Sequence, residues 1–153
     1  DALASIRLAA RHFRDRDVHV GAGTVLKPAE VDAVCEAGGK YIISPNTRPD
    51  VIRLTRERGL LSIPGFATPT EAFMAIDAGA DALKQFPCET PERIAVLKSV
   101  VPLPIFAVGG ISRANRDAYL ATAAGVGVGI GVYRPGMTMP ELRESAARFF
   151  DLA

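Results

Sequence analysis

The most constraining feature of this chain is the regular spacing of its short apolar runs. Six such runs, rich in β-branched residues, have centres about 21 residues apart, and they read VHVGAGT, YIISP, LLSIPG, ALKQFP, IFAVGG and VGVGIG. Strands that alternate with helices of roughly 10–15 residues form βαβ units, and such units build a parallel sheet. The spacing therefore predicts an α/β protein.

The stretches between these runs carry the signals of helix starts and ends. Thr68 precedes Pro69, and Glu71 stands three residues after Thr68, which is the pattern of a capping box. Gly79 then stands where such a helix would end. The stretch that begins at Thr90 repeats the Thr-Pro start, so we expect a helix there as well.

Six βα units fit either an open doubly wound sheet or most of a (β/α)8 barrel. The even spacing favours the barrel. So do the Gly, Pro, Ser and Thr residues after every predicted strand, because barrel active sites are assembled from those loops. The chain opens on a helical stretch, and six strands are two short of closure. We therefore predict a (β/α)8 TIM barrel seen from its second helix onward, with residues 1–153 as a single domain that lacks its first two βα units.

Composition narrows the classes of partner. The formal net charge is +1, so nothing in the charge balance favours nucleic acid or an anionic membrane surface. No apolar run approaches the roughly 20 residues of a membrane span. Cys35 and Cys88 are too few for a disulfide scaffold, and His12 and His19 are too few for a histidine-rich metal site. We predict a cytoplasmic chain with reduced cysteines and no bound metal.

Lys84 is the residue whose placement most needs an explanation, because Ala82, Leu83 and Phe86 surround it in an apolar run. Three interpretations are open: a lysine at a strand edge whose amine reaches solvent, a partner in a buried salt bridge, or a nucleophile. A lysine inside a barrel loses hydration, which disfavours its charged form and lowers its pKa. The neutral amine can then attack a ketone to form a Schiff base.

Gly109 and Gly110 also have two interpretations. They can simply form a tight turn between a strand and a helix, or their backbone N–H groups can cradle an anion at the start of the following helix. If two strands precede this chain, the run that ends at these glycines is the seventh strand of the barrel. The loops after strands 7 and 8 often bind phosphate. That agreement predicts a phosphate site at Gly109 and Gly110.

Other polar residues near the predicted loops have simpler explanations. Glu71 is explained better by its capping position than by catalysis. Glu89 follows the lysine strand and could reach the barrel mouth, although most such residues are solvated. Cys88 is more typical of a small buried apolar residue than of a nucleophile. Arg134, after the last predicted strand, faces either an anion or water.

In their order and spacing, six motifs resemble those of the class I aldolases that cleave 2-keto-3-deoxy-6-phosphogluconate and 2-keto-3-deoxy-6-phosphogalactonate. They read GAGTVL, SPN, PGFATPTEA, ALKQFP, AVGGIS and GVYRPG, and together they extend over essentially the whole chain. SPN and YRPG resemble the phosphogalactonate branch more closely. The resemblance implies an aldehyde-lyase that releases pyruvate and D-glyceraldehyde 3-phosphate, needs no cofactor and assembles as a homotrimer.

The resemblance also implies roles for particular residues. Lys84 would be the catalytic residue and form a Schiff base with pyruvate, and Gly109 and Gly110 would contact the phosphate. The substrate-binding residues would be Thr24, Pro45 and Phe86.

The chain departs from the family pattern in ways that leave alternatives open. The family's general acid/base, a glutamate, and a substrate-binding arginine lie on strands that correspond to positions before Asp1. The serine that the family usually carries after its last strand has no counterpart in GIGVYRPG. One alternative is therefore a non-catalytic or truncated barrel that binds phosphate. Another phosphate-binding barrel enzyme is a second alternative, but such an enzyme would not need Lys84.

Overall fold

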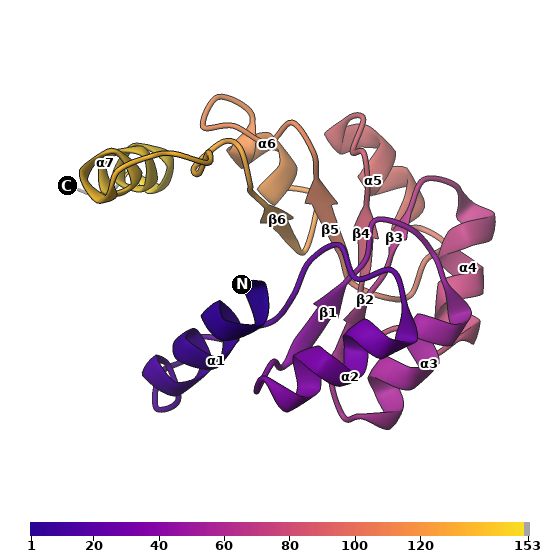
Figure 1. Cartoon of the computed structure of the whole chain (residues 1–153). Coiled ribbons are helices and arrows are strands. Elements are labelled where there is room, and N and C mark those ends of the chain that lie inside the picture. The colour runs from indigo at the N-terminus through magenta and orange to yellow at the C-terminus, as the bar shows by residue number, and fades with distance from the viewer. Residues whose placement is uncertain (152–153) are drawn as a thin grey trace.

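The computed structural model describes residues 1–151 and shows short parallel strands flanked by helices, of which the first and the last extend away from the strands (Figure 1). The strands are β1 Tyr41–Ile43, β2 Leu61–Ile63, β3 Gly65–Phe66, β4 Leu83–Gln85, β5 Ile105–Val108 and β6 Gly125–Gly127. The helices are α1 Ala2–His12, α2 Pro28–Glu36, α3 Pro49–Glu57, α4 Pro69–Asp77, α5 Pro91–Leu97, α6 Arg116–Leu120 and α7 Met139–Phe150. The predicted alternation of strands and helices is confirmed.

Neighbouring strands follow one another in chain order, as they do in a barrel. β1 pairs with β2, and β3, β4, β5 and β6 pair in that order, all in parallel. Pro64 separates β2 from β3, and these two short strands together occupy one predicted strand. A single row of paired residues crosses the larger sheet, and it consists of Gly65, Lys84, Phe106 and Gly125.

The first predicted strand, VHVGAGT at residues 18–24, was wrong as a regular strand. The structure has there only an isolated bridge between Ala22 and Ile42. The backbone still runs alongside β1, because the N–H of Ile43 donates to the carbonyl of Ala22 at 2.8 Å. The glycines on either side of Ala22 explain the short pairing, since glycine in a strand has no side chain to pack and weakens it.

The predicted helix boundaries around α4 are confirmed. The Thr68 hydroxyl accepts from the N–H of Glu71 at 3.5 Å, and the Glu71 carboxylate accepts from the N–H of Thr68 at 2.8 Å. Gly79 follows the helix with a φ of +96°, a conformation that favours glycine. α5 likewise begins after Thr90, whose hydroxyl accepts from the N–H of Arg93.

The apolar core lies between the strands and the outer helices, and this decides which way Lys84 faces. The larger core cluster includes Ala72 and Ala75 of α4, Ile94 of α5, Leu83 of β4 and Ile105 of β5. Successive residues of a strand point to opposite faces of its sheet. Because Leu83 faces the helices, Lys84 faces the other side of the sheet, which is the interior of the curved strand array. Within residues 1–151 no helix is both long and apolar enough to cross a bilayer.

Candidate active site

Lys84 is a buried amine without an acidic partner. It is 8% exposed, and its Nζ lies 4.1 Å from the centroid of the Phe86 ring. None of the ion pairs or side-chain hydrogen bonds within residues 1–151 involves its amine, so the salt-bridge interpretation is wrong. The strand-edge interpretation is wrong as well, because β4 pairs on both sides. Loss of hydration lowers the pKa of Lys84 below its ordinary value of 10.5.

The backbone of Pro45 packs closely against Gly65 of β3. Gly65 is the paired neighbour of Lys84 on β3, and a Cβ placed on Gly65 would lie 2.4 Å from the carbonyl carbon and oxygen of Pro45. Only glycine fits that contact, since any larger residue would push β3 away from the backbone of Pro45. The backbone of Pro45 therefore lies beside Gly65, which is the residue of β3 that pairs with Lys84.

Thr24 lies at the same ends of the strands. It has a φ of +59°, it is exposed, and it follows the bridge residue Ala22. The next residue, Val25, holds the loop to the end of β1: its N–H donates to the carbonyl of Ile43 at 3.3 Å, and its carbonyl accepts from the Ser44 hydroxyl at 2.7 Å. Thr24 is thus placed at the carboxyl end of β1.

Phe86 connects Lys84 to the loop that contains Gly109 and Gly110, which we call the diglycine loop. It is the first residue after β4, it is 36% exposed, and its N–H donates to the carbonyl of Phe66 at 3.1 Å. Its ring covers the amine of Lys84, and its Cδ2 lies 3.6 Å from where a Cβ of Gly109 would be. The structure therefore brings Lys84, Phe86 and Gly109 together in that order.

Gly109 and Gly110 have φ values of +111° and +67°, which confirms the predicted tight turn. Neither N–H donates to a backbone carbonyl within residues 1–151, and a Cβ on Gly110 would meet no atom within 4 Å. These two donors are free to bind an anion. The expectation that a helix begins directly after them was wrong, because α6 begins only at Arg116.

Asn115 closes this loop in place of a helix start, and sequence analysis missed it. Its Oδ1 accepts from the N–H of Ser112 at 2.8 Å, and its Nδ2 donates to the carbonyl of Gly110 at 3.0 Å. The available signal was its position directly before α6, where asparagine is a preferred first residue.

The two glutamates nearest these loops are already engaged. The carboxylate of Glu71 accepts from the N–H groups of Ala67 and Thr68, both at 2.8 Å, and these bonds lower its pKa, with Ala67 the larger cause. Glu89 forms an ion pair with Arg93 at 3.2 Å. Glu71 is thus a structural cap, as expected, and the carboxylate of Glu89 is paired with Arg93.

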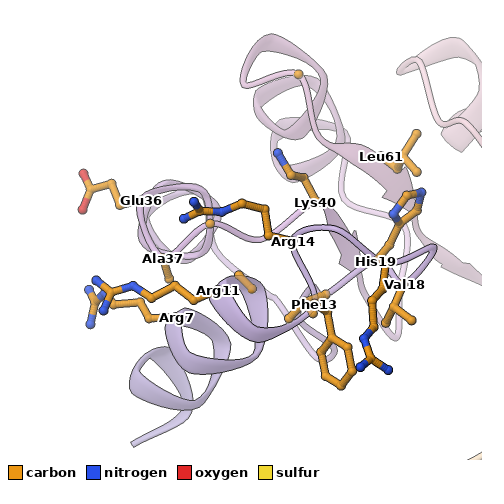
Figure 2. A pocket seen from close by; sticks show the side chains of 15 residues that line it. Arg7, Arg11, Phe13, Arg14, Val18, His19, Glu36, Ala37, Lys40 and Leu61 are labelled. Carbon is orange, nitrogen blue, oxygen red and sulfur yellow. The ribbon is translucent and has the colours of Figure 1, made fainter.

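A cavity of about 810 Å³ lies elsewhere, at the amino ends of β1 and β2 and beside α1 (Figure 2). Its basic lining residues are Arg7, Arg11, Arg14, Arg16, His19 and Lys40. None of the residues predicted to bind substrate lines it. The candidate active site therefore rests on the contacts among Lys84, Phe86 and the diglycine loop.

Comparison with known proteins identifies the family. The family model described as KDPG and KHG aldolase matches residues 1–138. The chain belongs to this family. Among its relatives, the 2-dehydro-3-deoxy-6-phosphogalactonate aldolase of Escherichia coli K12 is 44% identical over 135 residues, which are 85% of this chain. The expected resemblance, with the phosphogalactonate branch favoured, is thereby confirmed. The chain spans 66% and 62% of the length of two curated relatives that it matches.

Solved structures of the KDPG and KHG aldolase family confirm the barrel-type fold. The native KDPGal structure superposes with a TM-score of 0.90 at 40% identity, covering 96% of this chain and 73% of that one. The KDPG aldolase of Legionella pneumophila superposes with a TM-score of 0.77 at 25% identity, covering 97% of this chain and 71% of that one. In that structure, pyruvate is captured as a covalent carbinolamine.

Proposed function

We propose that the protein is a class I aldolase that cleaves 2-dehydro-3-deoxy-6-phosphogalactonate, or its gluconate epimer, into pyruvate and D-glyceraldehyde 3-phosphate. The observation that carries this proposal is Lys84, a buried amine with a lowered pKa and no acidic partner within residues 1–151. The uncharged form of an amine is the form that attacks a ketone, and a lowered pKa increases the fraction of the amine in that form. The covalent pyruvate adduct of the Legionella relative supports the same chemistry here.

In the proposed reaction, the Lys84 amine adds to the C2 ketone, and water leaves to give a protonated imine. The imine withdraws electrons, so the C3–C4 bond breaks to release the aldehyde and leave an enamine of pyruvate. Protonation of the enamine and hydrolysis then free pyruvate and the amine. The Phe86 ring, 4.1 Å from Nζ, stabilises the positive charge of the imine through a cation–π contact.

The phosphate would bind at the far side of the Phe86 ring. The free N–H groups of Gly109 and Gly110 would donate to its oxygens. Thr24 and Pro45 would line the path between the two ends of the substrate. A substrate with a keto group at one end and a phosphate at the other fits this arrangement of an amine and an anion cradle.

A base must accept the proton of the C4 hydroxyl. Glu71 and Glu89 are engaged in a helix cap and an ion pair. Following the family resemblance, we propose that this base is a glutamate outside residues 1–153. The homotrimer, the cytoplasmic location and the single-domain organisation of residues 1–153 likewise stay proposals that rest on the resemblance and the composition.

A coupled assay tests the proposed activity. The protein is incubated with each phosphorylated epimer, and released pyruvate is measured with lactate dehydrogenase and NADH. We expect faster release from the galactonate epimer and none above background from Lys84→Met. Equal release by Lys84→Met and the unmodified chain would contradict the proposal. No release from either epimer would favour the non-catalytic phosphate-binding barrel.

A further inference from the structure

The turn after the lysine strand is hydrogen-bonded twice to the diglycine loop, and both donors belong to Cys88. Its backbone N–H donates to the carbonyl of Val108 at 2.9 Å, and its thiol donates to the carbonyl of Gly109, also at 2.9 Å. Backbone N–H is available from almost any residue. The thiol bond, however, depends on the cysteine side chain.

These two carbonyls decide where the phosphate donors point. The carbonyl of Val108 and the N–H of Gly109 share one peptide plane, and the carbonyl of Gly109 shares the next with the N–H of Gly110. Both peptide bonds are trans, so each N–H points away from the carbonyl of its own plane. Cys88 therefore orients both planes at once, and it turns the two free N–H groups to the side opposite itself.

Packing reinforces the same arrangement. A Cβ on Gly109 would lie 3.4 Å from the Cα of Pro87 and 3.5 Å from the nitrogen of Cys88, which are contact distances. Tyr119 of α6 holds the residue that follows Cys88. It is 6% exposed, and its hydroxyl donates to the carbonyl of Glu89 at 3.2 Å. Burial first, and then the neighbouring Cys88, raise the pKa of Tyr119, so this donor keeps its proton at neutral pH.

We propose that Cys88 is a positioning residue, whose thiol holds the Gly109 carbonyl so that the N–H groups of Gly109 and Gly110 face the phosphate of the substrate. The inference rests on the proposed function and deepens its phosphate half. The hydrogen bonds of Cys88 go to the carbonyls of Val108 and Gly109, so this residue acts through the diglycine loop. It also explains how a loop without an adjacent helix start keeps two consecutive N–H groups aimed at an anion.

The test compares Cys88→Ala, Cys88→Ser and the matched control Cys35→Ala. Inorganic phosphate is titrated into each ¹⁵N-labelled protein, and its affinity is read from the amide shifts of Gly109 and Gly110. We expect Cys88→Ala to bind phosphate about fivefold more weakly, which is the effect of one lost hydrogen bond. Cys88→Ser keeps a donor and should stay within about twofold of the unmodified chain, as should Cys35→Ala.

A second measurement separates positioning from folding. The rate of borohydride trapping of pyruvate is measured on the same proteins, and we expect Cys88→Ala to change it far less than it changes phosphate affinity. Unchanged phosphate affinity in Cys88→Ala, or equal losses in affinity and trapping, would overturn the inference. Absence of phosphate binding by the unmodified chain would overturn it too. Failed pyruvate trapping alongside normal phosphate binding would instead count against the aldolase proposal, and the Cys88 comparison would still decide the inference.

Discussion

Burial and an aromatic neighbour act in opposite directions on the charge of Lys84. The ring of Phe86 favours the charged amine through its electron-rich face, whereas loss of hydration favours the neutral form. Loss of hydration lowers the pKa of Lys84 below its ordinary value. This balance suits a nucleophile, because the amine is neutral when it attacks and the ring stabilises the cation that forms afterwards.

The lowered pKa also predicts how stability depends on pH. Between the lowered folded pKa and the ordinary value of 10.5, the unfolded chain binds more protons at Lys84 than the folded chain does, so stability increases as pH rises through this window. Below the window the buried charge is a constant penalty. We expect Lys84→Met to be more stable than the unmodified chain at pH 6, and this advantage should shrink towards pH 10. Thermal melts across that range measure it, and parallel pH profiles of the two proteins would refute it.

At the scale of elements, the helix starts and ends could be predicted because they depend on short sequence patterns. The capping box of Thr68 and Glu71 and the glycine after α4 are short-range patterns, and the helix starts and ends where they indicate. The stretch at residues 18–24 failed as a strand because its pairing depends on glycines that contribute no side-chain packing.

The same scale offers a test of the role of Glu71. α7 carries a second capping box, formed by Thr138 and Glu141, with matching hydrogen bonds. If Glu71 is only a cap, Glu71→Ala and Glu141→Ala should each lower the free energy of unfolding by similar amounts and leave pyruvate trapping unchanged. Urea unfolding and borohydride trapping measure the two effects. Loss of trapping in Glu71→Ala alone would show that this carboxylate takes part in imine chemistry.

At the scale of the whole molecule, the spacing of the apolar runs predicted the barrel-type fold and placed Lys84 in a central strand. It could not predict the contacts between loops. The bonds from Cys88 to Gly109 and from Asn115 to Gly110 join residues of different loops, or of one loop folded back on itself. Their geometry depends on how the ends of neighbouring strands meet. The resemblance implied the site residues, and the structure shows that Lys84, Phe86 and Gly109 lie together.

The central claim is that Lys84, alone among the lysines, forms an imine with pyruvate. The most direct measurement is incubation of the protein with pyruvate and sodium borohydride, followed by digestion and mass spectrometry. We predict a reduced pyruvyl group on Lys84 and none on Lys27, Lys40 and Lys98, which are all exposed. A label on one of those lysines with Lys84 unmodified, or no label on the protein, would contradict the account.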